Sequence, residues 1–295
     1  IKTIRYVPIR EAGTKVAAVL KGEVDVINQV PAQYIAKIEE SDKAGIKIVR
    51  GTRIFHLGFS HGIESPVQDL RVRKAMAHAI NRDVIVKAVV EGRGAVANQP
   101  LHEWTEGGDD TRQWPYEYNP AKAKELLAEA GYPDGFSINF YAPAGRYTKD
   151  KEVTEAMAGF LRQVGIDVKY EALTWKKFVA TFRARTNADA EPFLYYIGYG
   201  NGGGDSDRAL SAIASCKGAW SGYCNPEIDE KLELASATID LDKRRTLFQE
   251  ITKTMADDVS HLMVWQEDAV WGLSNRVFWD VRNDDRLYAW TLEPR

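Results

Sequence analysis

The fold is decided by residues 136–207, which read FSINFYAPAGRYTKDKEVTEAMAGFLRQVGIDVKYEALTWKKFVATFRARTNADAEPFLYYIGYGNGGGDSD. Apolar side chains alternate along residues 136–140 and again along residues 166–170, as they do in strands. Between these runs they recur at helical spacing, and a second short helix is expected after Thr174, a residue type that favours the N-cap. The apolar run 193–197 predicts a third strand. The stretch therefore predicts three strands alternating with two helices and followed by a glycine-rich turn.

Strands that alternate with helices predict an α/β fold built from βαβ units. The crossovers in such units are almost always right-handed, so the strands run parallel. Loops 142–150 and 198–207 then lie at the same edge of the sheet, beyond the carboxyl ends of their strands. Ligands bind at this edge in open α/β sheets. We therefore expect the functional site in these two loops.

The composition argues against several classes of partner. With 39 Lys and Arg against 42 Asp and Glu, the net charge is −3, which gives no reason to expect binding to nucleic acid or to an anionic membrane. No apolar run approaches the roughly 20 residues that span a bilayer. At 295 residues, the chain is long enough for about two domains.

The two cysteines, Cys216 and Cys224, lie in a glycine-rich polar loop. Two buried free thiols are one interpretation. A local disulfide is favoured, because the loop has little other order and such a closure contributes roughly 2–3 kcal/mol to stability. A disulfide in turn indicates an oxidising compartment.

The first residues, 1–6, look like the inside of a strand. They contain no initiator Met and no apolar signal core. We therefore expect the chain to be a fragment or a processed product, with any export signal lost upstream.

Capping residues mark several further helices. Asp69 is expected to cap one helix and Asp83 the next. Asn119 and Asn225 are each followed by proline, the pattern of an N-cap and a first helical residue. Further strands are predicted over residues 23–27, 46–49, 54–59 and 262–265, with Gly58 as punctuation. In the long connection 91–118, Trp104 and Trp114 either line a pocket or anchor the packing.

Arg146 is the sharpest candidate for binding, because it lies in a loop at the expected ligand edge. Its planar guanidinium can hold a ligand carboxylate through two parallel hydrogen bonds, although an exposed Arg is more often solvated or paired locally. Its neighbour Tyr147 can shape the pocket wall. We expect both side chains to face a ligand.

The glycine-rich turn also allows a different class of function. Gly198, Gly200 and Gly203 fit the spacing Gly-x-Gly-x-x-Gly after a strand, which is found in nucleotide-dependent α/β enzymes. The helix expected next is short, and no strand with a terminal acid follows about 20 residues later, so this alternative is the weaker one. His56 and His61 have no acid at ligand spacing, so neither a metal nor a cofactor is expected. No nucleophile with an adjacent base is evident, which argues against an enzyme.

Several segments together resemble the later part of a family 5 extracellular solute-binding protein, the group of dipeptide, oligopeptide and nickel binding proteins that serve ABC importers. Each alone is weak, but they occur in the order found in that family. The matching segments are AAVLKGEVD (17–25), DLRVRKA (69–75) with INR (80–82), YNPAKAKELLAEAGY (118–132), GRY (145–147) with DKE (150–152), and VGIDV (164–168).

The resemblance implies a periplasmic-binding-protein-like fold of type II, with two lobes that close on a ligand at a hinge. Residues 1–57 and 266–295 would form an incomplete first lobe, and residues 58–265 the second. The implied function is the capture of a small peptide-like or carboxylated solute in the periplasm or outside the cell. The implied partner is the membrane permease of an ABC importer, and a monomer is expected.

The resemblance also bears on the turn 198–207, whose glycines let the backbone approach a ligand closely. Peptide-binding members carry an acidic residue that pairs with the α-amino group of the ligand, and Gly202 occupies that position here. Asp205 either takes over this role or serves as a cap or turn residue, and Asp207 is another candidate for the cap of the helix expected to begin at Arg208. Tyr199 and Asn201 complete the ligand-binding candidates of the turn.

Overall fold

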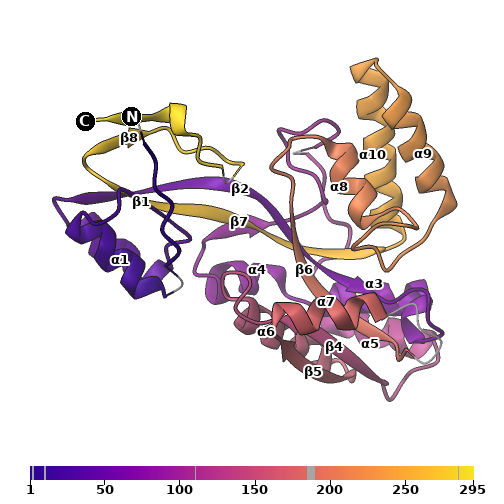
Figure 1. Cartoon of the computed structure of the whole chain (residues 1–295). Coiled ribbons are helices and arrows are strands. Elements are labelled where there is room, and N and C mark those ends of the chain that lie inside the picture. Colours follow the sequence, from indigo (N-terminus) through magenta and orange to yellow (C-terminus); the bar gives the residue numbers. More distant parts are fainter. Residues whose placement is uncertain (2, 10, 110, 185–189, 285) are drawn as a thin grey trace. The chain divides into compact units, whose positions relative to one another are not determined.

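Two long strands, β2 (Ala44–Phe59) and β7 (His261–Ser274), each run through both of the units into which the chain divides. Unit 1 consists of Ile1–Thr52 and Glu267–Arg295, and unit 2 of Arg53–Gln266. The computed structural model describes every residue except 2, 10, 110, 185–189 and 285 (Figure 1). The units divide at 52/53 and 266/267, whereas the resemblance implies boundaries at 57/58 and 265/266.

Unit 1 has a small hydrophobic core beside helix α1 (Ala12–Lys21). Gly22 ends this helix in the left-handed conformation, with φ at 74°. Strand β1 (Val26–Asn28) pairs antiparallel with β7 and begins later than the strand predicted over residues 23–27. The other elements are η1 (Ala32–Tyr34), α2 (Ile35–Glu39), η5 (Ala289–Thr291) and the antiparallel pair β8 (Val277–Trp279) and β9 (Leu292–Pro294).

The strand predicted over residues 1–6 is wrong. Residue 1 and residues 3–6 have no regular secondary structure, and residue 2 lies outside the described residues. Alternating apolar residues form a strand only where a neighbouring strand accepts their backbone hydrogen bonds.

The predicted βαβ stretch forms the centre of unit 2. Strands β4 (Ser137–Pro143), β5 (Asp167–Leu173) and β6 (Phe193–Gly200) run parallel, with β4 in the middle. The helices between them are α6 (Asp150–Gln163) and α7 (Trp175–Arg183). On its other edge, β6 pairs antiparallel with β2. The predicted parallel α/β arrangement is confirmed.

The order of these strands fixes the positions of their helices. The chain moves outward from β4 to β5 and then returns across β4 to β6. Right-handed crossovers in opposite directions place their helices on opposite faces of the sheet. Helix α6 accordingly packs against α3 (Leu70–Ala79), whereas α7 packs through Phe182 on Tyr195 of β6.

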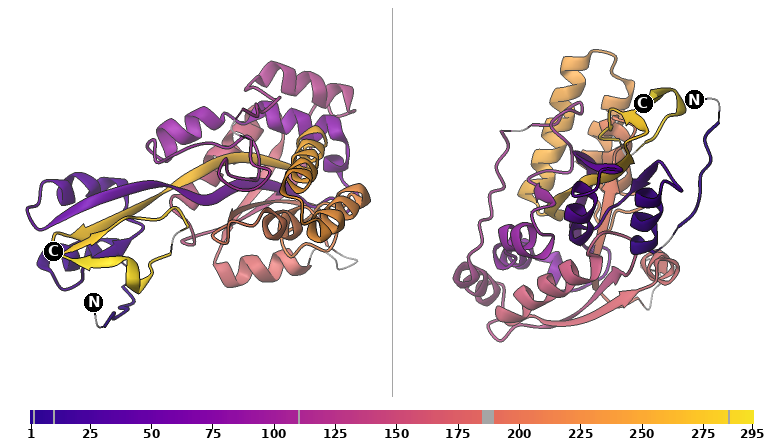
Figure 2. Two further views of the ribbon diagram at one scale, coloured as in Figure 1. Left: turned by 90° about the horizontal axis from the view of Figure 1, so that it is seen from above. Right: turned by 90° about the vertical axis from the view of Figure 1, so that its left-hand side faces the viewer.

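The remaining helices of unit 2 begin mostly at the predicted caps. Asp69 caps α3, Asn119 caps α5 (Pro120–Glu129) and Asn225 caps α9 (Pro226–Ala237), each accepting a hydrogen bond from a backbone amide. Helix α9 packs side by side with α10 (Leu241–Asp257) (Figure 2). The short elements are η2 (Pro66–Gln68), α4 (Arg82–Val84), the π-helical turn η3 (Ile85–Val89), β3 (Gly94–Val96) and α8 (Ser206–Ile213).

The cap predicted at Asp83 is wrong. Asn81 is the N-cap, and its side-chain oxygen accepts a hydrogen bond from the amide of Val84 at 3.0 Å. Asp83 lies inside the short helix that Asn81 begins. Asn is as good an N-cap as Asp, and it comes two residues earlier in the chain.

Strand β2 is continuous over 16 residues and includes the predicted strands 46–49 and 54–59, with Gly58 inside it and not as punctuation. Gly58 lies opposite Tyr195 in the pairing with β6. A Cβ atom at position 58 would lie 2.0 Å from Cζ of Tyr195. The glycine therefore makes room for an aromatic ring within a regular strand.

Unit 2 encloses the larger hydrophobic core, which surrounds both faces of the sheet. Tyr195 and Tyr196 point to opposite faces of β6 and are both completely buried. None of the helices built from described residues is long and apolar enough to cross a membrane.

Candidate functional site

The loop after β4 is folded around the carboxylate of Asp150. This carboxylate accepts hydrogen bonds from the backbone amides of Gly145 at 3.1 Å, Arg146 at 2.8 Å and Tyr147 at 3.0 Å. Asp150 is 4% exposed, and Gly145 adopts a φ of 71°, which suits glycine. The three amides are thus bonded within the loop, and the side chains of residues 146 and 147 project from a fixed frame.

Tyr147 joins the two loops that the sequence places at one edge. Its hydroxyl donates a hydrogen bond to the backbone oxygen of Gly198 at 3.2 Å. Its ring packs edge-on against Phe55, with the ring centroids 5.1 Å apart. At position 198, a Cβ atom would lie 2.4 Å from Cε1 of the same Phe55. The glycine at the end of β6 thus allows the close approach of these side chains.

Arg146 extends from this frame as an exposed side chain. Its Cζ lies 5.1 Å from the ring centroid of Tyr147 and 5.2 Å from that of Trp175, within the range of cation–π attraction. Within the described part of the chain, no carboxylate pairs with its guanidinium. The donors of Arg146 are therefore available to an anionic ligand.

Trp175 belongs to the candidate site, and the sequence interpretation missed it. It is the first residue of α7, directly after the cap Thr174. Because β5 runs parallel to β4 and β6, the start of α7 lies at the same edge as the two predicted loops. The loop between β5 and α7 was the signal that could have identified this side chain.

The end of β6 and the glycine-rich turn after it hold the other predicted site residues. Tyr199 is half-buried, and its hydroxyl donates to the backbone oxygen of Arg208 at 3.3 Å. Asn201 is 4% exposed, and neither atom of its side-chain amide has a hydrogen-bond partner among the described residues. Gly202, the next residue, is half-buried. Gly204, the last of the three glycines 202–204, adopts a φ of 74°.

Asp205 has a structural role in this turn. It is the N-cap of α8, accepting from the amide of Asp207 at 2.9 Å, so the alternative that Asp207 caps this helix is wrong. The helix begins at Ser206, two residues before the expected start at Arg208, which leaves Asp207 inside it. Asp205 also pairs with Arg244 at 3.1 Å.

Arg244 ties the turn to the long connection 91–118. Its second guanidinium nitrogen lies 2.5 Å from Oε2 of Glu106, and the two side chains are 19% and 16% exposed. The hydroxyl of Ser206 donates to the backbone oxygen of the same Glu106. These contacts hold the far end of the turn against the connection.

The tryptophans of that connection differ in their environment. Trp104 is 40% exposed and stacks on His102, whereas Trp114 is 9% exposed and lies beneath the guanidinium of Arg82. Trp114 therefore acts as a packing anchor. Trp104 presents its other face to solvent.

Three of the five histidines are buried, namely His56, His102 and His261. His56 and His261 pack edge to face with centroids 4.8 Å apart, and Nε2 of His261 lies 3.1 Å from the hydroxyl of Tyr195. Burial lowers the pKa of His56 to about 3 and that of His61 to about 4. Across the described residues, no group of three or more His, Cys, Asp or Glu side chains could hold a metal ion.

The predicted disulfide is present between Cys216 and Cys224, in the connection from α8 to α9. The prediction that the two thiols are joined is confirmed. The amide of Cys216 donates to a carboxylate oxygen of Asp229 at 3.0 Å, which fixes one end of the loop to α9.

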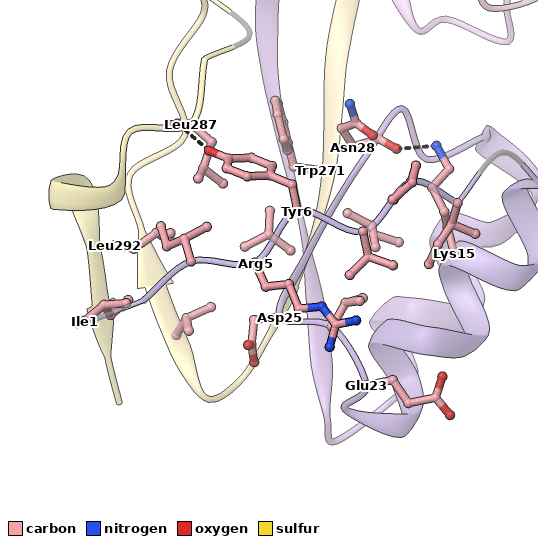
Figure 3. Close-up of a pocket in the computed structure, with 18 of the residues that line it drawn as sticks. Ile1, Arg5, Tyr6, Lys15, Glu23, Asp25, Asn28, Trp271, Leu287 and Leu292 are labelled. Carbon is pink, nitrogen blue, oxygen red and sulfur yellow. Dashed lines mark hydrogen bonds between the residues drawn. The ribbon is translucent and has the colours of Figure 1, made fainter.

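Unit 1 has a cavity of its own, of about 760 Å³, beside β1 and residues 3–9 (Figure 3). Trp271, Leu287 and Leu292 contribute to its mainly apolar wall, and the hydroxyl of Tyr6 donates to the backbone oxygen of Leu287 at 3.5 Å. None of the side chains predicted for the site lines it. We therefore place the candidate site in unit 2, at the carboxyl edge of its parallel strands.

Comparison with known proteins identifies the family. The family model "Bacterial extracellular solute-binding proteins, family 5 Middle" matches residues 1–221 of this chain. The chain belongs to this family. The resemblance seen in the sequence is thereby confirmed.

Similar proteins in this family have been named for what they bind. The chain is 27% identical to a glutathione-binding protein of Pectobacterium atrosepticum, over 98% of this chain and 57% of the relative. It is 28% identical to a dipeptide-binding protein of Escherichia coli, over 90% of this chain and 50% of the relative. The chain thus spans about half the length of these relatives.

Solved structures agree on the fold. A dipeptide-binding protein from Pseudoalteromonas, solved in complex with Met-Leu, superimposes with a TM-score of 0.83 at 22% identity, over 97% of this chain and 57% of that chain. The family 5 fold, a periplasmic-binding-protein fold of type II, is therefore confirmed for this chain. Nothing in the comparisons supports the nucleotide-dependent enzyme.

Proposed function

We propose that this protein is the substrate-binding component of an ABC importer and captures a small carboxylated or short-peptide solute. The observation that carries the proposal is the exposed guanidinium of Arg146, which is held over Tyr147 and Trp175 and pairs with no carboxylate among the described residues. A planar cation with free donors is suited to a carboxylate. Its family and the peptide and glutathione ligands of similar proteins support the same solute class.

In this proposal, Tyr147 and Trp175 have complementary roles. Their rings flank the guanidinium, leaving its edge for two parallel hydrogen bonds to one carboxylate. The half-buried ring of Trp175 offers an apolar surface next to that carboxylate. Tyr199, Asn201 and Gly202 form the neighbouring wall, where the backbone can approach the rest of the solute.

Asp205 supports this wall indirectly, as the N-cap of the helix α8 that follows the turn. Because Asp205 is engaged by Arg244 and by the helix α8, we assign the recognition of charge to Arg146 instead. The same cap disfavours a nucleotide, since a diphosphate at the start of α8 would meet a carboxylate. The protein acts by binding the solute, and no catalytic step is proposed.

The proposed partner is the membrane permease of the importer, and the proposed location is the periplasm or the cell exterior. The oxidised pair Cys216 and Cys224 fits such a compartment. We propose that the solute favours a closed arrangement of two lobes, as expected when a ligand binds one of two conformations more tightly.

Ligand-dependent melting tests this proposal. Glutathione and Met-Leu are expected to raise the melting temperature, because a ligand stabilises the folded state by RT ln(1 + [L]/Kd). Met-Leu amide, which lacks the carboxylate, should give a smaller shift. Arg146→Ala should abolish the shift, whereas Arg183→Ala, an exposed arginine at the end of α7, should keep it.

Two results would contradict the proposal. One is that neither probe changes the melting temperature of the unsubstituted protein. The other is that Arg146→Ala binds both probes as tightly as the unsubstituted protein does.

A further inference from the structure

The disulfide loop, residues 216–224, is anchored to the centre of unit 2. The hydroxyl of Tyr195 donates to the backbone oxygen of Trp220 at 3.0 Å and accepts from the amide of Gly222 at 3.1 Å. The backbone oxygen of Gly222 accepts from the amide of His61 at 2.9 Å. A Cβ atom at position 222 would lie 2.3 Å from the backbone oxygen of Phe59, so the loop lies directly on β2.

Trp220 projects from this loop into the aromatic layer of α7. The centroid of its ring lies 5.6 Å from that of Trp175 and 5.4 Å from that of Phe182. The planes are tilted by 35° and 37°, so the indole packs obliquely against both rings. Trp220 therefore limits the positions that the half-buried Trp175 can take.

Trp175 in turn contacts Arg146. The guanidinium lies over the rings of Trp175 and Tyr147, and no ion pair within the described residues fixes it elsewhere. Tyr147 is held by its hydrogen bond to Gly198, but Trp175 has no hydrogen bond from its side chain among those the structure describes. Packing therefore places Trp175, and among the aromatic contacts described for it, Trp220 is the one that comes from outside its own helix and Tyr147.

We propose that the disulfide loop is a positioning element of the site, on the basis of the proposed function: through Trp220 it holds Trp175 and so orients the guanidinium of Arg146. Trp220 does not contact the solute in this scheme. The disulfide limits the conformations of the short loop, which contains two glycines, in addition to the hydrogen bonds that Ser221 makes with Gly218 and Tyr223. The backbone of Trp220 is also held, because its amide donates to the backbone oxygen of Ala212 at 2.9 Å and its oxygen accepts from Tyr195. Loss of the closure therefore loosens the loop around these contacts, and the aromatic support of Arg146 weakens.

The position of Arg146 can be measured without any ligand. Protons of a guanidinium that lies over aromatic rings are shifted upfield in NMR spectra, and the Arg146 signal is identified by its loss in Arg146→Lys. In Trp220→Leu, this signal should move toward the position of a free arginine. In Trp220→Phe, which keeps a flat ring beside Trp175, the signal should stay close to its original position.

Two further variants complete the design. The double variant Cys216→Ser with Cys224→Ser should move the Arg146 signal in the same direction as Trp220→Leu. Trp104→Leu is the matched control, because Trp104 stacks on His102 and belongs to another part of unit 2. It should leave the signal unchanged. If Trp220→Leu does not fold, the cysteine variant still decides the question.

Binding provides the second measurement. Trp220→Leu should weaken the binding of glutathione or Met-Leu by roughly two- to fivefold, the range expected from the loss of an exposed cation–π contact. In an Arg146→Ala background, Trp220→Leu should have no further effect, since the two residues act through one group.

The outcomes separate this inference from the proposed function. An Arg146 signal that stays in place in Trp220→Leu or in the cysteine variant overturns the positioning role. An additive effect of Trp220→Leu and Arg146→Ala on binding overturns it as well. If neither probe binds the unsubstituted protein, the proposed function fails, and the NMR signal still decides whether Trp220 positions Arg146.

Discussion

The hydroxyl of Tyr147 lies 3.2 Å from the backbone oxygen of Gly198 and donates a hydrogen bond to it. This bond joins the loop after β4 to the end of β6. We expect Tyr147→Phe to lower the free energy of unfolding by about 1 kcal/mol, because a partly buried acceptor loses its donor. Urea unfolding measures this change.

Tyr199→Phe is the control for that variant. The hydroxyl of Tyr199 donates to the backbone oxygen of Arg208 at an exposed position, where water can replace it. Its loss should have a smaller effect than the loss of the Tyr147 hydroxyl. Equal effects of the two substitutions would contradict the role assigned to Tyr147.

Gly58 is expected to tolerate no side chain. A Cβ atom at this position would lie 2.0 Å from Cζ of the buried Tyr195 ring, and β2 or β6 must shift to accept it. Gly58→Ala should therefore lower the free energy of unfolding by about 3 kcal/mol or more. At Gly62, where no heavy atom lies within 4 Å of such a Cβ, alanine should change it by less than about 0.5 kcal/mol. Thermal unfolding of both variants measures the difference.

Arg244 and Arg245 are neighbours in α10 with different expected contributions. Arg244 pairs with Glu106, and both side chains are largely buried, so Arg244→Ala should destabilise the protein by about 2 kcal/mol. Arg245 pairs with Asp242, and these side chains are 52% and 89% exposed, so Arg245→Ala should have an effect below about 0.5 kcal/mol. Urea unfolding compares the two.

Hydrogen exchange of the backbone amides in the turn 201–205 is a second measurement for the same pair of variants. Arg244→Ala removes a partner of Asp205, so the amides of the turn should exchange with solvent faster. Unchanged exchange in Arg244→Ala would refute the claim that this arginine holds the turn.

The buried histidines predict a loss of stability in acid. Burial lowers the pKa of His56 to about 3, whereas the unfolded chain has the ordinary value near 6.5. The unfolded state therefore binds more protons between these values, so the stability present above pH 6.5 falls as the pH decreases toward about 3. Burial and the neighbouring His56 and His61 also lower the pKa of His261.

His56→Leu tests this dependence. Between pH 6 and pH 4, the free energy of unfolding should fall less steeply in the variant than in the unsubstituted protein. The two slopes should differ by up to about 1.4 kcal/mol per pH unit. Urea unfolding at a series of pH values gives both slopes. Parallel slopes would show that His56 does not contribute.

The sequence predicted those parts of the fold that depend on local patterns. The alternation along β4, the helical spacing of α6 and the caps Asn119 and Asn225 are all properties of neighbouring residues. Right-handed crossovers then place the loops after β4 and β6 at one edge. This rule is general enough to need no knowledge of individual contacts.

Features that depend on distant contacts were not predicted. Trp175 contacts Arg146, which lies 175 − 146 = 29 positions earlier in the chain. Trp220, which contacts Trp175, lies 220 − 175 = 45 positions later. Gly58 was interpreted as punctuation because its role depends on the ring of Tyr195 in a different strand. The position of Asp205 at the N-cap of α8 was open because two aspartates stand within reach of the helix start.

The carboxylate of Asp150 has a practical consequence for protein engineering. Since it already accepts from the amides of residues 145–147, we expect the loop to retain its backbone shape with any residue other than proline at position 146. A library of substitutions at this single position would change the charge and length of the group offered to a solute without rebuilding the loop. Position 146 is thus a natural starting point for redirecting the protein to solutes of another chemistry.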